Sequence, residues 1–355
     1  DLLGFMMGDL RGKLTKVGRI DLMRSVDDKA TKYFAELDPR DLSDRALEEQ
    51  ARSLTGIGQV RLEDANHAEA MKAFREAHER TTALYDRKPD DGQRLFDRAQ
   101  TEYWIGYVAW QQGNLEEAQR WLTRYRDSAL QLAPMDPKNF DWQKEVAYGY
   151  HNLAVLQEAR GDHEGAERAM KRELELFHTW AKQRPKDTVL RAEEAAVVSW
   201  LGTNAEAQKR FKDAETWYAE QLAIFDELRR VEPDNADYRK EWVDAQLLLA
   251  QARYKLGDFD NARIASEAAN HESDAMVRQD PENRSWQGQQ AIGRYWRASI
   301  EGVGQPRAAM PIAQEAERML KGIVAAEPKD KRMAHWLDLT HELQTQLSKP
   351  EVATR

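Results

Sequence analysis

Prolines recur in this chain at a nearly constant interval, and that interval restricts the fold more than any other feature. The prolines in question are Pro89, Pro137, Pro185, Pro233, Pro281 and Pro328, and only the last interval is one residue shorter than the others. A proline ends a helix because its ring occupies the backbone nitrogen and restricts the residue before it. The interval therefore predicts one structural repeat of about 48 residues along the chain.

Three of the predicted repeats carry the same turn signal near their middle. The signal reads Gly113-Asn114 in one repeat, Gly161-Asp162 in the next and Gly257-Asp258 in a later one. Glycine accepts the left-handed backbone that closes a helix, and the Asn or Asp after it can cap the next helix. The fourth repeat departs from the signal with Lys209-Arg210-Phe211, and the sixth with Gly304-Gln305-Pro306. An alanine follows each turn at the same interval, at Ala70, Ala118, Ala166, Ala214, Ala262 and, one residue early, Ala309.

Small residues recur in the first half of each repeat, each directly after an apolar one: Gly58, Gly106, Ala154, Gly202 and Ala250. A small side chain lets two helix backbones approach closely, so this position predicts a helix–helix contact. The segments between turns and prolines, such as 138–160 and 163–183, are about twenty residues long with few breakers, which is typical of helices. Val, Ile and Thr do not alternate over long stretches, so strands have no support. Each repeat is therefore predicted to be a pair of antiparallel helices.

The pattern of an apolar–small pair, then a Gly-Asp turn with an aromatic residue and an alanine, then a proline, resembles the tetratricopeptide repeat (TPR). It is clearest at Leu249-Ala250, Gly257-Asp258-Phe259-Asp260-Asn261-Ala262 and Pro281. The unit of that family has about 34 residues, so each helix here is expected to be longer by about two turns. The resemblance implies an all-α fold, namely a right-handed α-solenoid of antiparallel helix pairs.

We expect six TPR-like repeats, at 42–89, 90–137, 138–185, 186–233, 234–281 and 282–328. Residues 1–41 are expected to form a non-repeat helical cap, and residues 329–355 a C-terminal capping helix and tail, because the outer faces of an array have no neighbouring repeat. The segment Asp9-Leu10-Arg11-Gly12-Lys13-Leu14 is similar to lead-in segments of bacterial multidomain signalling proteins, in which a repeat array follows an effector domain, often after a membrane helix. The chain begins at Asp1 without a methionine, so we expect it to be part of a longer protein.

Composition narrows the classes of function. The net charge of −9 disfavours nucleic acid as a partner, because a protein that grips nucleic acid needs a basic face. Cysteine is absent, which excludes disulfides and thiolate metal sites. No run of about eighteen apolar residues occurs, so we expect no membrane span in this chain, and a preceding membrane helix stays an open alternative. The compartment is undetermined, and a membrane-tethered bacterial protein is one candidate. The basic residues Arg11 and Lys13 suit a membrane surface, although short charge runs usually form a solvated helix face.

Sequence motifs for catalysis are missing. The chain has no G-x-S-x-G, no phosphate-binding glycine loop and no H-E-x-x-H. His335 and His341 are six residues apart, a spacing that puts them on different faces of a helix. Acidic pairs such as Glu116-Glu117 are adjacent, so their side chains diverge. We therefore predict that this chain is not an enzyme and holds no metal or cofactor, whereas an attached domain could be catalytic.

The resemblance implies that the first helix of each repeat lines a concave groove. Tyr103, Tyr107 and Trp110 are spaced by four and three residues, which puts them on one stripe of such a helix. Asn152 falls where the family often carries an asparagine that holds a peptide backbone. The expected partner-binding residues are Tyr103, Trp104, Tyr107, Trp110, Tyr148, His151, Asn152, Trp200, Tyr254, Arg294 and Tyr295.

Aromatic side chains with a polar tip suit recognition, because they bury a large area and still form hydrogen bonds. The alternative is that these side chains fill the space between long helices, and for Trp104 and Trp200 both interpretations stay open. Trp142, Tyr238 and Trp286 recur at one repeat position, which indicates packing.

The predicted function is binding of a protein or peptide partner in the aromatic groove, which would regulate an attached effector domain. One alternative is a self-association module that forms a homo-oligomer and brings effector domains together. Another is a sensor for a small ligand. The sequence does not identify the partner, because a general groove says little about specificity.

Overall fold

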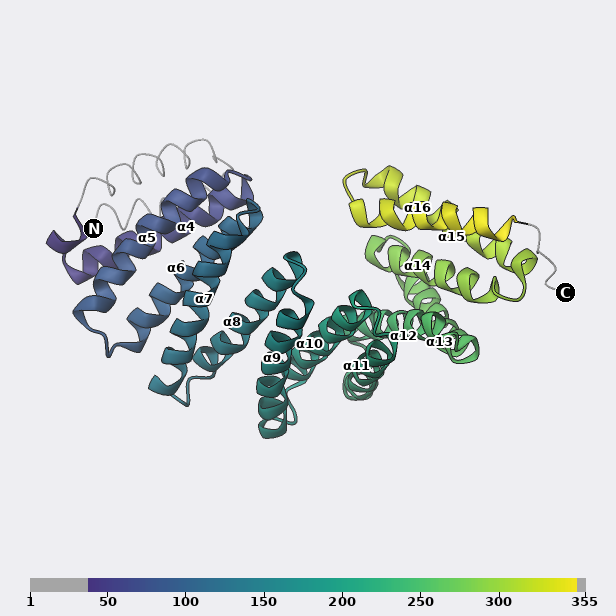
Figure 1. Ribbon diagram of the computed structural model, residues 1–355, viewed down its shortest axis with the longest axis horizontal. Helices are drawn as coiled ribbons and strands as arrows, with labels where there is room; N and C mark the ends of the chain where they lie inside the picture. The colour runs from purple at the N-terminus through teal and green to yellow at the C-terminus, as the bar shows by residue number, and fades with distance from the viewer. Residues whose placement is uncertain (1–37, 350–355) are drawn as a thin grey trace. The chain divides into compact units, whose positions relative to one another are not determined.

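The computed structural model describes residues 38–349, and this part of the chain is helical throughout, without a strand (Figure 1). The expected N-terminal cap and the lead-in segment up to residue 37 lie outside the described residues. Two short 3-10 helices, η2 (Pro39–Asp41) and η3 (Ala133–Met135), accompany the α-helices. These are α4 (Asp44–Glu63), α5 (His67–Arg87), α6 (Gly92–Gln111), α7 (Leu115–Leu132), α8 (Phe140–Ala159), α9 (His163–Gln183), α10 (Thr188–Ala207), α11 (Phe211–Val231), α12 (Ala236–Leu256), α13 (Phe259–Gln279), α14 (Arg284–Glu301), α15 (Pro306–Ala326) and α16 (Lys331–Leu347).

Contacts divide the chain into two compact halves. The N-terminal half comprises Asp1–Glu173 and the C-terminal half Leu174–Arg355, with the division inside α9. In the N-terminal half, each helix from α4 to α7 packs on the helix that follows it in the sequence. The same holds for each helix from α10 to α15 in the C-terminal half. Packing of consecutive helix pairs defines an α-solenoid, so the predicted all-α solenoid is confirmed.

Five helix pairs in the described part of the chain share one backbone geometry in the turn between their two helices. Its left-handed residue recurs at the interval of the prolines, at Ala65, Gly113, Gly161, Lys209 and Gly257, with φ between 56° and 78°. The next residue caps the following helix in most of these turns: the Asn114 side chain, for example, accepts a hydrogen bond from the Glu117 amide. The predicted turn therefore extends to two repeats in which the sequence offers no glycine.

The recurring small residues lie at close helix contacts, as predicted. A Cβ atom added to Gly58, Gly106 or Gly202 would come within 3.0 Å of a large side chain on the second helix of the same pair. The side chains in question are Phe74, Leu122 and Tyr218, and each is sixteen residues beyond its glycine. The absence of a side chain at these three positions therefore sets how closely the paired helices pack.

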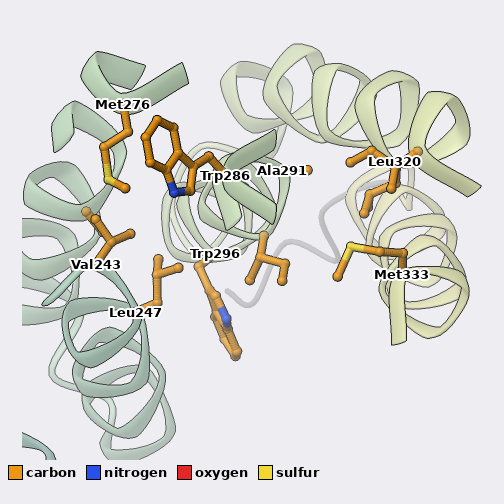
Figure 2. Packing of buried hydrophobic residues seen from close by; sticks show 11 residues of the cluster. Val243, Leu247, Met276, Trp286, Ala291, Trp296, Leu320 and Met333 are labelled. Atoms are coloured by element: carbon orange, nitrogen blue, oxygen red, sulfur yellow. The ribbon is translucent and has the colours of Figure 1, made fainter. Parts of the chain in front are cut away.

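Buried apolar residues from successive helices form the core of each half. In the C-terminal half, Figure 2 shows Val243, Leu247, Met276, Trp286, Leu320 and Met333 facing one another from α12 to α16. Trp286 is 9% exposed and Tyr238 is 7% exposed, which agrees with their predicted packing role. Trp142 packs partly buried against Leu95 in the N-terminal half.

Candidate functional site

Three aromatic side chains form a continuous row along α6. The ring centroids of Tyr103 and Tyr107 are 5.9 Å apart, and those of Tyr107 and Trp110 are also 5.9 Å apart. The rings are tilted relative to each other by 32° and 52°, so they do not stack face to face. All three side chains are partly buried. The row therefore presents aromatic surface on one face of the helix, as its sequence spacing predicts.

A pocket of about 190 Å³ lies beside this row, which we call the aromatic pocket. Its lining comes from α6, from α7 and from α8, all within the N-terminal half. The residues are Tyr103, Tyr107, Trp110, Leu122, His151, Asn152, Val155 and Leu156. Five residues that the sequence analysis named as partner-binding thus meet at one place, although they come from two predicted repeats.

His151 joins the aromatic pocket to a buried carboxyl group. Its Nδ1 atom lies 3.3 Å from Oε2 of Glu173, a residue that is only 4% exposed. The hydrogen bond to Glu173 raises the pKa of His151 against the opposing effect of burial. Burial raises the pKa of Glu173, and the imidazole partly offsets this effect. One wall of the pocket therefore carries a polar pair with no net charge when the imidazole is protonated and the carboxyl is ionised.

A second polar group on α8 is directed to its own helix. The side-chain amide of Asn152 donates a hydrogen bond of 2.7 Å to the backbone carbonyl of Tyr148. This bond uses one of the two N–H donors of the carboxamide, which fixes the orientation of the side chain at the edge of the pocket.

A buried network supports the aromatic row from behind. The Tyr125 ring lies 5.6 Å from the ring of Tyr103, and its hydroxyl donates a 2.5 Å hydrogen bond to Glu145. The side-chain amide of Gln100 donates to the same carboxylate oxygen at 2.7 Å. Burial raises the pKa of Glu145 and also that of Tyr103. These bonds join α6, α7 and α8, so the support of the pocket is held from three helices.

The sequence analysis did not predict this supporting network, although the repeat interval indicates where its residues lie. Tyr125 and Glu173 occupy the same position in successive repeats, as do Tyr103 and His151. A residue that packs behind Tyr103 is therefore expected to have an equivalent behind His151, one repeat later in the sequence.

The other two aromatic residues predicted in the N-terminal half lie outside the lining of the pocket. The Trp104 ring stacks on Phe74 with centroids 5.4 Å apart and an interplanar angle of 6°, so it packs between α5 and α6. Tyr148 on α8 is 36% exposed. In the C-terminal half, Trp200 on α10 is 41% exposed.

The three remaining predicted residues lie among the last helices of the C-terminal half. Tyr254 and Tyr295 both pack against Trp296, with ring centroids 6.0 Å and 5.2 Å apart. Arg294 forms ion pairs with Asp274 on α13 at 2.8 Å and with Glu315 on α15 at 3.2 Å. The guanidinium of Arg294 therefore links three successive helices.

Residues 38–349 contain neither a metal-binding cluster nor a helix that could span a membrane. No cluster of three or more histidine or carboxylate side chains there has the arrangement that a metal ion needs. Among the same residues, no helix combines the length and the apolar character required to cross a bilayer.

Taken together, successive helix pairs, a turn of one geometry that recurs at one interval and a pocket between consecutive pairs define a helical-repeat protein. The family model of the tetratricopeptide repeat matches residues 99–124 and 147–172, which contain the aromatic row and the His151–Asn152 edge of the pocket. The chain is a TPR-like repeat protein. No curated protein matches its sequence.

Solved structures show the same fold at low sequence identity. BtubC (BKLC) from P. vanneervenii aligns with a TM-score of 0.50 at 16% identity, covering 76% of this chain and 91% of that one. The apo form of RapI aligns with a TM-score of 0.52 at 13% identity, covering 83% and 95%. A signal transduction ATPase with numerous domains and a TPR sensor, from Pyrococcus horikoshii, aligns with a TM-score of 0.51 at 16% identity. It covers 94% of this chain, which corresponds to 48% of that protein.

Proposed function

We propose that this chain is a protein-interaction module whose aromatic pocket takes one apolar side chain of a partner protein. The observation that carries the proposal is the meeting of Tyr103, Tyr107, Trp110, His151 and Asn152 around a single pocket. Aromatic residues with polar tips are the side chains that most often supply the binding energy of protein interfaces.

The size of the pocket favours a side chain over a free small molecule. Pockets for small molecules typically hold about 300–1,000 Å³, whereas the aromatic pocket holds about 190 Å³. Leu122, Val155 and Leu156 add aliphatic surface to the lining of the same pocket. Burying one large apolar side chain there contributes about 1.5–3 kcal/mol, and ring–ring contacts add about 0.5–1.5 kcal/mol.

That sum is close to the binding free energy of a millimolar complex, about 4 kcal/mol. A single anchor is therefore too weak for a stable interaction, and the partner must make further contacts outside this pocket.

The lining of the pocket supports a role in binding rather than catalysis. His151 is paired with a carboxyl group, as in many catalytic sites, but among the described residues no serine, threonine or cysteine lines the aromatic pocket to act as a nucleophile. The hydrogen bonds of Glu145 and Asn152 hold the surrounding side chains in place, which lowers the entropy cost of receiving a guest.

Regulation of an attached domain is the second part of the proposal. One of the solved structures with this fold is described as a signal transduction ATPase with a TPR sensor. By analogy of fold, we propose that the present chain reports the binding of its partner to another domain of the same protein.

The test is selection of peptides from a random dodecapeptide library on the whole chain. Peptides that bind are then measured by fluorescence anisotropy on the wild type and on the variants Tyr107→Ala and Trp110→Ala. Each variant is expected to weaken binding by about tenfold or more, because an anchor side chain loses its packing surface. Leu130→Ala is the matched control, since Leu130 is apolar and 44% exposed on α7 but lies outside the pocket.

The proposal is wrong if selected peptides bind the Trp110→Ala variant with unchanged affinity while circular dichroism shows an intact fold. Light scattering on the free chain separates the self-association alternative, because a stable oligomer at micromolar concentration would favour it.

A further inference from the structure

A second pocket shares α6 with the aromatic pocket, and its chemistry differs from that of the aromatic pocket. It has a volume of about 680 Å³ and is formed by α4, α5 and α6. We call it the polar pocket. Glu48, Arg52 and Thr55 line it from α4, and Asp97 and Gln100 line it from α6. The proposed function does not use it.

Asp97 is a partly buried carboxylate that forms no ion pair within residues 38–349. Its Oδ1 accepts a 2.8 Å hydrogen bond from the side chain of Gln93 on the same helix. Burial raises the pKa of Asp97, Glu48 adds to this effect and Arg52 opposes it. A carboxylate that has lost part of its hydration without gaining a cation is complementary to a cationic group.

The charges around Asp97 leave an excess of one negative charge. Asp91 is paired with Lys88 at 3.1 Å, and Arg94 is paired with Asp44 at 2.5 Å. Three charged side chains of the lining then remain without an ion pair in the described part of the chain. They are Glu48, Arg52 and Asp97, two acids and one base. The polar pocket therefore suits a guest with one positive charge.

The polar pocket and the aromatic pocket both take part of their lining from α6. Asp97, Gln100, Tyr103, Tyr107 and Trp110 follow one another at intervals of three or four residues, so each is a neighbour of the next and the row winds gradually around the helix from one pocket to the other. Gln100 belongs to the polar pocket and donates to Glu145, the carboxylate that supports the aromatic row. A segment that fills the aromatic pocket and follows this row of neighbouring side chains along α6 reaches Asp97.

We propose that Asp97 binds a lysine or arginine side chain of the same partner segment whose apolar anchor fills the aromatic pocket. This inference rests on the proposed function and adds the charge of the partner to it. Asp97 and Tyr107 are ten residues apart, which is about 15 Å along the helix. An extended peptide covers that distance in about four to six residues. The recognised segment thus carries a basic residue about four to six positions from an apolar one.

The test compares selections from the random dodecapeptide library on four versions of the whole chain: wild type, Asp97→Asn, Trp110→Ala and, as a charge-matched control, Asp127→Asn. Asp127 is an exposed acid on α7 and lies outside both pockets. On the wild type and the control, selected peptides are expected to contain the basic residue at the stated spacing from an apolar residue. On Asp97→Asn the apolar residue is expected to persist and the preference for the basic residue to disappear.

A binding cycle makes the assignment quantitative. One peptide selected on the wild type is measured with its lysine or arginine intact and with that residue changed to glutamine, on the wild type and on Asp97→Asn. Each single change is expected to weaken binding by about tenfold, and the two together by little more than one of them. Additive losses would overturn the assignment of Asp97 as the contact.

The two proposals fail in different ways. Persistence of the basic preference on Asp97→Asn overturns only the inference about Asp97. Unchanged selection on Trp110→Ala overturns the proposed function, and with it the present inference. Thermal unfolding of Asp97→Asn is the fold control: its melting temperature is expected to equal or exceed that of the wild type, because asparagine carries no charge that burial disfavours.

Discussion

Tyr103 and His151 are equivalent residues of successive repeats, and they line the same pocket from α6 and from α8. The residues behind them are equivalent as well. Tyr125 lies behind Tyr103 with ring centroids 5.6 Å apart, and Glu173 lies behind His151 at 3.3 Å. One wall is therefore an aromatic pair and the other a polar pair, at a single sequence position of the repeat. This asymmetry gives the pocket one apolar side and one side that can respond to protonation.

The first prediction concerns pH. The pKa of His151 is raised in the native state by its hydrogen bond to Glu173. The resulting stabilisation is fully present below the unfolded value, about 6.5, and is lost as the pH rises through the higher native value. His151→Gln should therefore lower the free energy of unfolding most near pH 6, by about 1 kcal/mol at most, because the side chain is 36% exposed and solvent screens the pair.

Urea unfolding of the wild type and His151→Gln between about pH 6 and pH 9 checks this. The difference between the two proteins should shrink as the pH rises. A difference that grows with pH would contradict the sign of the interaction.

The second prediction concerns the left-handed turn. Lys209 has φ of 58° at a position where the equivalent residues Gly113 and Gly257 have φ of 75° and 78°. A left-handed backbone costs a non-glycine residue about 1–2 kcal/mol, and glycine loses part of that gain through its freer unfolded chain. Lys209→Gly should therefore stabilise the protein by about 0.5–1 kcal/mol, and Gly113→Ala should destabilise it by about 1 kcal/mol. Chemical denaturation of both variants measures the change, and a destabilising Lys209→Gly or a stabilising Gly113→Ala would refute the assignment.

The third prediction uses two glycines as a matched pair. A Cβ atom at Gly202 would press on the ring of Tyr218, whereas no described atom lies within 4 Å of a Cβ atom at Gly322 on α15. Gly202→Ala should cost about 1–3 kcal/mol through overpacking. Gly322→Ala should stabilise the chain by about 0.5–1 kcal/mol, because alanine is the better helix former. Thermal melting of the two variants gives the comparison, and equal shifts would mean that Gly202 is not at a tight contact.

The fourth prediction separates structure from recognition in the C-terminal half. Arg294 is bonded to Asp274, Glu315 and Asn270, and its side chain is 11% exposed. Arg294→Ala should lower the free energy of unfolding by about 1–3 kcal/mol, because it leaves these partners unpaired. Affinity for peptides selected on the aromatic pocket should stay unchanged, since the pocket belongs to the N-terminal half. A variant with wild-type stability and weakened binding would instead place Arg294 in the recognition surface.

The period of the sequence predicts the helix pairs, the positions of the turns and the contacts of Gly58, Gly106 and Gly202. It fails at Ala65 and Lys209, whose left-handed geometry is imposed by the packing of the helices on either side rather than by their own preference.

The residues of the candidate site likewise divide into those that the sequence predicts and those that it does not. Helical spacing places Tyr103, Tyr107 and Trp110 together, and the period brings in His151. Leu122 and Glu173 were not predicted, because their place at the site depends on how α7 and α9 lie against their neighbours, and a one-dimensional pattern does not contain that information. The bonds of Arg294 to α13 and α15 were missed for the same reason.

The recurrence of one turn geometry at equal intervals has a consequence for how such a chain can change. Cutting at two equivalent turns and rejoining the ends restores the same local backbone, so whole repeat blocks can be gained or lost without redesigning any junction. The aromatic pocket needs only two adjacent repeat blocks, so these two blocks carry the complete pocket when they are moved together. A lineage could therefore vary the length of the array freely while it keeps, duplicates or discards this recognition element as a single piece.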